Sequence, residues 1–251
     1  MKSDSANPAK TSNKTATGIV DFDSITGGGL PRGRTTLLMG GSGAGKTVMA
    51  LQFLVHGAGH CKEPGIFVAF EENSQRIVAN ASSFGWKMES LMPKKLFILD
   101  AQPPADLVRS GDFDLSGMLA ALAVKAKAMQ AQRIVLDALD MVMVLLPDVE
   151  SRRREIYRLH EWLLAQHLTA LITLKADAEK PNDIAQQPLG FMQFMADCTV
   201  ILKHSMVVGV SQRSLRVQKY RGSGFDEDEA LFVIGKRGLK LGARPQEVRA
   251  S

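Results

Sequence analysis

The most constraining feature of this sequence is a glycine-rich segment at residues 40–47, which reads Gly-Gly-Ser-Gly-Ala-Gly-Lys-Thr. It matches the phosphate-loop pattern G-x-x-x-x-G-K-S/T at every fixed position. The apolar, β-branched run 35–39 before it predicts a strand, and residues 48–54 after it predict a helix. In a strand–turn–helix arrangement, backbone N–H groups and the positive end of the helix surround a polyphosphate. The segment therefore predicts an α/β fold that binds a nucleotide.

The residues of this loop have separate expected roles. The Lys46 ammonium would reach the β- and γ-phosphates, and the Thr47 hydroxyl would ligate Mg²⁺. A nucleoside triphosphate and Mg²⁺ are therefore the expected ligands. The predicted phosphate-binding residues are Gly41, Ser42, Gly43, Ala44, Gly45, Lys46 and Thr47. The alternative is a glycine-rich turn that matches the pattern by chance.

Short apolar runs alternate with helical patterns along most of the chain, and such runs suit strands buried on both faces of a parallel sheet. The expected strands are residues 66–70, 96–100, 133–137 and 168–174. The expected helices include residues 115–129 and residues 151–167, the second capped by Ser151. Residues 199–202, 214–218 and 230–234 come without helices between them and predict antiparallel strands. The predicted fold is α/β, with a mostly parallel central sheet, helices on both faces and an antiparallel C-terminal extension.

The composition of the chain predicts its domain limits and its localisation. Polar residues 1–16 are predicted to form a disordered tail, residues 17–243 one domain, and residues 244–251 a C-terminal tail. The net charge of +5 says little about partners. Two cysteines, Cys61 and Cys198, make no disulfide framework and predict reduced thiols. Without an apolar stretch of membrane-spanning length or a secretory signal, we expect a cytoplasmic protein with no membrane contact.

Carboxylates follow two of the predicted strands and are candidates for metal binding and catalysis. Asp137 closes the run 133–137 and resembles a Walker B aspartate, which would hold a Mg²⁺-bound water beside Thr47. Glu71 and Glu72 directly follow the strand 66–70, where one glutamate could orient the attacking water. The other could help to organise the water shell of the metal. The alternatives are an aspartate that caps a loop and a solvated glutamate pair.

Two basic residues near the C-terminus could complete a neighbouring subunit's site. Lys219 and Arg221 flank Tyr220 at the end of a strand that cannot easily fold back over its own phosphate loop. Alternate residues on a strand point the same way, so both would project to one side. This suits an arginine finger donated in trans, although a basic hairpin tip in solvent is an equal alternative.

The arginines at 152–154 are interpreted as a solvated helix face, with nucleic-acid binding as the competing interpretation.

A family resemblance joins these motifs. The residues that carry it are Thr17-Gly18, Gly28-Gly29-Leu30-Pro31, residues 40–47, Gln52-Phe53-Leu54, Glu63-Pro64-Gly65, Phe70-Glu71-Glu72, Ser83-Phe84-Gly85-Trp86, residues 95–101, Lys219, Arg221 and Gly222. On these residues the chain resembles the circadian-clock KaiC family, specifically its N-terminal RecA-like ATPase domain.

The resemblance implies a RecA-like P-loop NTPase that forms a hexameric ring with ATP between subunits and hydrolyses it slowly. It implies that Glu71 is the catalytic glutamate, that Glu72 is its partner at the metal, and that Lys219 and Arg221 contact the nucleotide in trans. It extends the predicted nucleotide contacts to Ser83, Tyr220 and Ser223. It also implies a clock or signalling protein as partner.

The chain departs from the family's pattern at several places. It holds one such domain where the clock protein has two, so it is either one half of a longer protein or a stand-alone relative. The family's Thr-Thr-Glu-Arg after the fourth strand is Thr173-Leu174-Lys175-Ala176 here, on the γ-phosphate side. Phe225 stands near the place of a histidine, and Gly235-Lys236 replaces Thr-Asp. The phosphorylatable Ser-Thr pair has no counterpart in residues 191–195, so no autokinase activity is expected.

Two rival functions remain open on the sequence. A recombinase of the RecA/RadA type would bring DNA-contacting groups to the loop 175–196. That loop has only Lys175 and Lys180 as basic residues, and the acidic residues nearby are Asp177, Glu179, Asp183 and Asp197, so nucleic-acid binding is not expected. The other rival is a scaffold that binds nucleotide in order to assemble and does not hydrolyse it.

Overall fold

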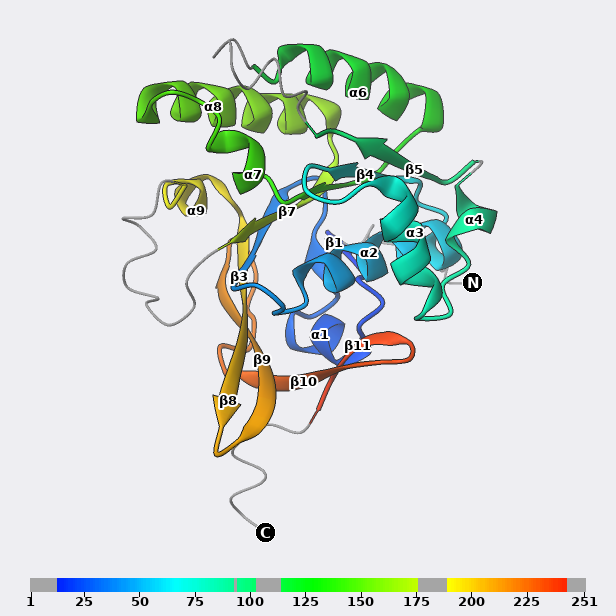
Figure 1. The fold of residues 1–251 in the computed structure, drawn as a ribbon, viewed down its shortest axis with the longest axis vertical. Coiled ribbons are helices and arrows are strands. Elements are labelled where there is room, and N and C mark those ends of the chain that lie inside the picture. The colour runs from blue at the N-terminus through cyan, green and yellow to red at the C-terminus, as the bar shows by residue number, and fades with distance from the viewer. Residues whose placement is uncertain (1–12, 93, 103–113, 176–188, 243–251) are drawn as a thin grey trace, which may run out of the picture.

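The computed structural model describes residues 13–92, 94–102, 114–175 and 189–242. A nine-stranded sheet in the order β11-β10-β9-β8-β3-β7-β6-β4-β5 runs through the described chain, with helices on both of its faces (Figure 1). The predicted α/β fold with a mostly parallel central sheet is therefore confirmed.

Six neighbouring strands of the sheet are parallel. In spatial order they are β8 (Cys198–Val207), β3 (Thr35–Gly40), β7 (Thr169–Lys175), β6 (Arg133–Asp137), β4 (Gly65–Ala69) and β5 (Leu96–Asp100). Their cores are apolar on both faces, as the short apolar runs in the sequence predict. Because these strands run the same way, the segments that follow β3, β7, β6 and β4 gather at one edge of the sheet.

The antiparallel part of the sheet begins one strand later than expected. Residues 199–202 belong to β8, which pairs in parallel with β3 and in antiparallel with β9. The antiparallel strands are β9 (Val210–Tyr220), β10 (Ala230–Gly235) and β11 (Gly238–Leu241). An apolar pattern in the sequence predicts that a segment forms a strand, but it does not predict whether the neighbouring strand runs parallel or antiparallel to it. The parallel pairing of β8 with β3 was therefore not predicted.

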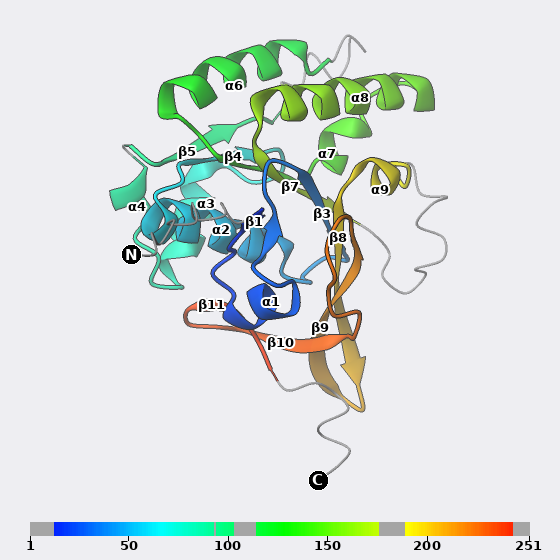
Figure 2. The same cartoon turned by 180° about the vertical axis from the view of Figure 1, so that it is seen from behind.

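Helices form a layer on each face of the sheet, as Figure 1 and the reverse view in Figure 2 show. One layer holds α6 (Ser116–Met129), α7 (Asp140–Met143) and α8 (Val149–Gln166). The other holds α1 (Val20–Ile25), α2 (Lys46–His56), η1 (Gly57–Cys61), α3 (Ser74–Ser82) and α4 (Met88–Leu91). Successive residues of β3 point to opposite faces of the sheet. Leu38 therefore packs in the core that contains α2, whereas Leu37 and Met39 pack in the core that contains α8.

In the described part of the chain, no helix is both long and apolar enough to cross a membrane.

Helix α8 starts earlier than its sequence pattern suggests. Its cap is Asp148, whose carboxylate accepts a 2.7 Å hydrogen bond from the Ser151 N–H, so Ser151 lies inside the first turn and is not the cap. Aspartate is as good a cap as serine, and the sequence offers both within four positions.

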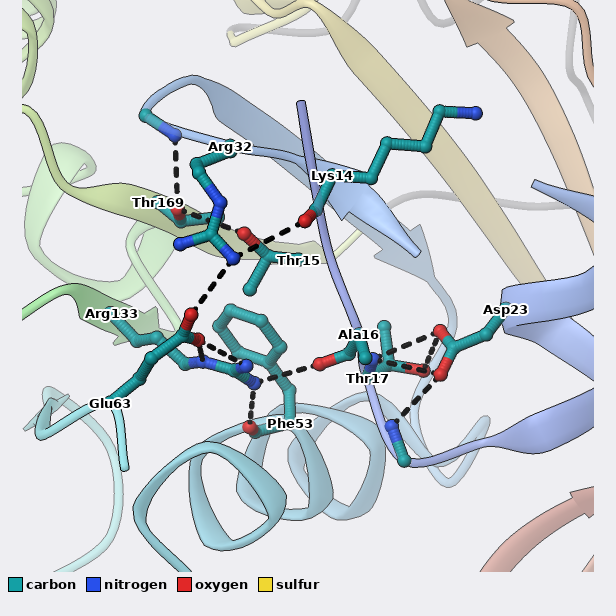
Figure 3. Close-up of polar contacts among 12 residues, drawn as sticks. Lys14, Thr15, Ala16, Thr17, Asp23, Arg32, Phe53, Glu63, Arg133 and Thr169 are labelled. Atoms are coloured by element: carbon teal, nitrogen blue, oxygen red, sulfur yellow. Dashed lines mark hydrogen bonds and ion pairs between the residues drawn. The ribbon is translucent and has the colours of Figure 1, made fainter. Parts of the chain in front are cut away.

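Residues 14–16, which fall within the expected N-terminal tail, form part of the described fold. Strand β1 (Lys14–Thr15) pairs with β2 (Leu30–Pro31), and the side chains of Thr15 and Thr17 are buried. Asp23 accepts hydrogen bonds from the Thr17 backbone and hydroxyl (Figure 3). Residues 1–12 of that tail and the expected C-terminal tail 244–251 lie outside the described residues.

A buried guanidinium joins this N-terminal segment to the sheet (Figure 3). Arg133, at the start of β6, is fully buried, and its Nε donates to Glu63 at 2.7 Å. Its Nη1 donates to the carbonyls of Phe53 at 2.7 Å and of Ala16 at 2.9 Å. A second arginine, Arg32, also contacts Glu63, at 2.8 Å. The charge of Arg133 is therefore paired and its donors are satisfied, as burial requires.

Candidate nucleotide site

The phosphate loop joins β3 to α2 and opens a cleft of about 360 Å³ at the carboxyl edge of the parallel strands. The strand order places the loop after β3 first, then Lys175 at the end of β7, Asp137 at the end of β6 and Glu71 just after β4. All of them line this cleft. Ligands of open α/β sheets bind at this edge.

The loop has the backbone form that phosphate binding needs. Gly43 and Gly45 have φ angles of 70° and 102°, which other residues rarely adopt. A Cβ on Gly45 would also lie 2.9 Å from the Ile234 side chain of β10. Helix α2 begins at Lys46 without a side-chain cap and has no acidic residue in its first turn. Its first N–H groups are therefore left available to an anion.

The Lys46 side chain lies along the loop. Its Nζ donates to the carbonyls of Gly40 at 2.8 Å and Gly41 at 2.9 Å. Burial lowers the pKa of Lys46, and the carboxylates of Asp137, Asp140 and Glu71 oppose that shift. A phosphate group, which is a better acceptor than a carbonyl, would favour the charged ammonium further.

Thr47 and Asp137, the predicted metal-binding residues, lie together at one side of the cleft. The Thr47 hydroxyl donates to Asp137 Oδ2 at 2.9 Å, and the Thr173 hydroxyl donates to Asp137 Oδ1. Burial raises the pKa of Asp137, although the two hydroxyl donors and Lys46 oppose the shift.

These oxygen donors fit Mg²⁺, which binds to proteins through one or two side chains and keeps water and phosphate oxygens as its other ligands. No cluster of three or more His, Cys, Asp or Glu side chains suited to a metal ion occurs among the described residues. Thr47 and Asp137 would hold the ion together with a nucleotide and not by themselves.

Glu71 and Glu72 face different surroundings. Glu71 is exposed and lines both the cleft and an adjoining hollow of about 580 Å³. Glu72 lines only that hollow, and its Oε1 accepts a 3.0 Å hydrogen bond from Asn80 of α3. Of the two, Glu71 is therefore the one that reaches toward the loop, while Asn80 holds Glu72 toward the outer side.

The residues expected to act in trans lie far from this cleft. Tyr220 pairs with Cys198, which pairs with Thr36 near the amino end of β3, whereas the loop follows Gly40 at the carboxyl end. The four intervening steps span roughly 13 Å of strand. Lys219 and Arg221 are therefore at the opposite edge of the sheet from their own phosphate loop.

The side chains of this group make contacts within the subunit. Lys219 donates to the Gln193 carbonyl at 2.5 Å and Arg221 to the Phe194 carbonyl at 2.7 Å, so both point toward α9 (Met192–Met195). This is the shared direction that strand alternation predicts. Tyr220 is buried, and its hydroxyl donates to the Gly29 carbonyl at 3.0 Å. Ser223 accepts from Lys14 at 2.6 Å.

Ser83 is also outside the cleft. It is exposed at the end of α3, and its hydroxyl donates to the Asn80 carbonyl at 2.7 Å. Its role in nucleotide binding stays a prediction, as do those of Tyr220 and Ser223. The acidic residues of the loop 175–196, together with Lys180, lie outside the described residues.

The structure adds cleft residues that sequence reasoning missed. Asp140, at the start of α7, lines the cleft and accepts a 3.1 Å hydrogen bond from the Lys175 N–H. Asp140 follows Asp137 by three residues, so its position at the same edge of the sheet could have been predicted from the sequence. Ile234 lines the cleft from β10, and Arg213 of β9 donates to the Gly43 carbonyl at 3.3 Å. No local motif marks these two, because the fold of the antiparallel strands brings them to the loop.

Comparison with known proteins identifies relatives of this fold and site. The family described as "ATPase: KaiC" matches residues 15–246. The circadian clock oscillator protein KaiC of Prochlorococcus marinus is 38% identical over 91% of this chain and 45% of its own length. The circadian clock protein KaiC2 of Synechocystis is 34% identical over 91% of this chain and 40% of its own. The chain thus spans less than half the length of these curated relatives.

A solved structure agrees with the sequence matches. The KaiC-like protein PH0186 from the hyperthermophilic archaeon Pyrococcus horikoshii OT3 superposes with a TM-score of 0.79 at 27% identity. The match covers 92% of this chain and 99% of that one. The fold, the phosphate loop and the family match lead to one conclusion: the chain belongs to the KaiC ATPase family.

Proposed function

We propose that this protein binds ATP with Mg²⁺ and hydrolyses it slowly, in a hexameric ring of identical subunits with nucleotide at the interfaces. The observation that carries the proposal is the arrangement of Lys46, Thr47, Asp137 and Glu71 around one cleft. A phosphate-binding loop alone supports nucleotide binding. Hydrolysis requires in addition a pair of residues that can hold Mg²⁺ and a carboxylate beside it, and the exposed Glu71 supplies that carboxylate.

Each side chain has a definable task in this reaction. Lys46 leaves the loop carbonyls and binds the β- and γ-phosphates. Thr47 and Asp137 would hold Mg²⁺, which would supply charge neutralisation on the phosphate oxygens. Glu71 accepts a hydrogen bond from the attacking water and holds it in line with the γ-phosphate, while Glu72, fixed by Asn80, orders water on the outer side.

Ring assembly would complete the site. Lys219 and Arg221 lie at the edge of the sheet opposite their own loop, so the nucleotide that they can reach belongs to another subunit. In that role they would exchange their contacts with the carbonyls of α9 for phosphate oxygens. Tyr220, Ser223 and Ser83 are proposed as further nucleotide contacts of the assembled ring.

The cellular role is proposed from the family. We infer a cytoplasmic signalling or clock-related module whose nucleotide state controls the binding of a protein partner. Autokinase activity is not part of this proposal, since residues 191–195 offer no serine or threonine. Phosphopeptide mapping after incubation with ATP would contradict that point by finding a stoichiometric site.

The proposal is tested by measuring phosphate release, nucleotide affinity and solution mass on the same samples. The parent protein, Lys46→Ala and Glu71→Gln are compared with and without ATP and Mg²⁺. We expect nucleotide-dependent assembly of the parent, loss of binding in Lys46→Ala, and binding without turnover in Glu71→Gln. Parent-rate hydrolysis by Lys46→Ala would refute the proposal.

The same measurements separate the two rival functions. A nucleotide-dependent scaffold would bind and assemble normally, with residual turnover that Glu71→Gln does not change. A DNA-dependent ATPase of the recombinase type would show salt-dependent affinity for DNA, with a slope that reports the number of phosphate contacts.

A further inference from the structure

Lys175 lines the cleft but belongs neither to the phosphate loop nor to the carboxylates around it. It is the last residue of β7 and pairs with Gly40 at the start of the phosphate loop. Strand β7 lies between β3 and β6 in the sheet. Lys175 is therefore placed between the loop on one side and Asp137 on the other.

The backbone of Lys175 is fixed while its side chain is exposed. Its N–H donates to Asp140 Oδ1 at 3.1 Å, and the preceding Leu174 is buried in the core. The side chain lines the cleft. Within the described parts of the chain, its ammonium makes neither a hydrogen bond nor an ion pair. It is a cation on a rigid base that is available to a ligand.

The charges around Lys175 indicate what kind of ligand it would meet. The cleft is lined by two lysines, Lys46 and Lys175, and by three carboxylates, Glu71, Asp137 and Asp140. Without Lys175, a single lysine would face three carboxylates in a site that must accept a polyanion. Lys46 reaches the phosphates from the loop side, so a cation between the loop and Asp137 meets the outermost phosphate.

We propose that Lys175 binds the γ-phosphate of ATP from within the same subunit, and this inference rests on the proposed function. The resulting contact exists with a triphosphate and is absent with a diphosphate. Lys175 therefore makes the subunit discriminate ATP from ADP before any residue of a neighbouring subunit contributes. It also adds positive charge where negative charge collects during phosphoryl transfer.

The main alternative is that Lys175 only balances the charge of the three carboxylates. A residue that acts in this way would lower the affinity for ADP as well as for ATP when its charge is removed, because both nucleotides are anions. A γ-phosphate contact lowers the affinity for ATP and leaves that for ADP nearly unaltered. The affinity for ADP is thus the readout that separates the two roles.

The experiment compares the dissociation constants of ADP and a non-hydrolysable ATP analogue, each with Mg²⁺. The variants are Lys175→Gln, which removes the charge, and Lys175→Arg, which keeps it. The control is Lys127→Gln, an exposed lysine on α6 away from the cleft. We expect the preference for the triphosphate to fall about tenfold in Lys175→Gln, and to be unchanged in Lys175→Arg and in the control.

Each result has a separate meaning. An unchanged preference in Lys175→Gln, or a loss of affinity for ADP as well as for ATP, would overturn the inference and leave the proposed ATPase function intact. A parent protein that binds neither nucleotide would refute the proposed function and the inference with it.

Discussion

Thr47 and Asp137 stand 90 residues apart in the sequence and are joined by a 2.9 Å hydrogen bond from hydroxyl to carboxylate. Thr47 is in the first turn of α2, and Asp137 is the last residue of β6. A second hydroxyl, that of Thr173, holds the other oxygen of the same carboxylate. Two threonines from neighbouring parts of the sheet edge thus fix the orientation of one half-buried acid through both of its oxygens.

Thr47→Val should abolish Mg²⁺-dependent hydrolysis, while Thr47→Ser should keep most of it. Valine preserves the shape of threonine but removes both the metal ligand and the hydrogen bond to Asp137. The contribution of a catalytic metal is several kcal/mol, so we expect a loss of about 100-fold or more in kcat. Magnesium titrations of phosphate release measure the effect. Equal rates in the valine variant and the parent would contradict the assigned role of Thr47.

Asp137→Asn should stabilise the protein in the absence of nucleotide and metal, although it removes activity. Burial raises the pKa of Asp137, so the ionised carboxylate is costly in the folded state. Asparagine removes that charge, and the adjacent hydroxyls can still pair with its amide. We expect a gain of about 1 kcal/mol at neutral pH, the usual size of such site substitutions.

The pH dependence of stability gives an independent check on Asp137. A raised pKa means that the folded protein holds a proton that the unfolded chain has released. Its contribution is complete below the unfolded pKa of about 3.9 and is lost as pH rises through the higher folded pKa. Asp137→Asn should flatten this part of the denaturation profile. The exposed Glu161→Gln on α8 is the control and should leave the profile unchanged.

Glu71→Gln and Glu72→Gln should have unequal effects, because only Glu71 lines the cleft at the phosphate loop. For Glu71→Gln we expect a loss of about 10²–10⁴-fold in kcat with nucleotide affinity retained. For Glu72→Gln, whose side chain can still accept from Asn80, we expect a loss below about 10-fold and a higher Mg²⁺ requirement. Single-turnover kinetics with both variants distinguish them. The reverse order of effects would exchange the two assignments.

The sequence predicts those parts of the site that are local motifs. Residues 40–47, Asp137 and Glu71 each sit at the end of an apolar run, and parallel strands bring such ends to one edge. The parallel direction of β8 and the approach of Ile234 and Arg213 to the loop could not be predicted in this way. They depend on long-range pairing, which local periodicity does not encode.

The positions and contacts of Lys219 and Arg221 are a second feature that the sequence predicts only in part. Their distance from their own loop follows from the register of three strands, β3, β8 and β9. The sequence predicts a common direction for the two side chains but not their contacts with α9. The local sequence around a basic residue at a strand end is the same whether the residue contacts the nucleotide of another subunit or is exposed to solvent.

Glu63→Ala should destabilise the fold by about 3–5 kcal/mol, since it leaves the fully buried Arg133 guanidinium without its counter-ion. Burial opposes ionisation of Glu63, but Arg133 and Arg32 outweigh it and hold the pKa of Glu63 below its usual value. The stabilisation is therefore present above the unfolded pKa of about 4.3 and is lost as pH falls through the folded pKa.

Denaturant unfolding measures the effect of Glu63→Ala, and a second ion pair supplies the control. Lys203 and Glu229 are 3.2 Å apart, and both side chains are about one third exposed. Lys203→Ala should therefore cost no more than about 1 kcal/mol. Similar losses in the two variants would show that burial of Arg133 does not govern the stability of the N-terminal segment.

Mixing two inactive variants should restore hydrolysis if the nucleotide site is shared between subunits. Arg221→Ala keeps an intact phosphate loop and Glu71, and Glu71→Gln, which is expected to bind nucleotide and assemble, keeps an intact Arg221. Alone, each should lose at least about 10²-fold in rate. In an equal mixture of a symmetric ring, about a quarter of the interfaces combine the two intact halves, so about a quarter of the parent rate should return.

The matched control mixes Thr47→Val with Glu71→Gln, whose defects lie on the same side of the interface. In that mixture no interface between two different variants gains a complete site, because each subunit carries a damaged loop or a damaged glutamate. Phosphate release should stay at the level of the separate variants. Recovery in both mixtures, or in neither, would contradict the assignment of Arg221 to the nucleotide of a neighbouring subunit.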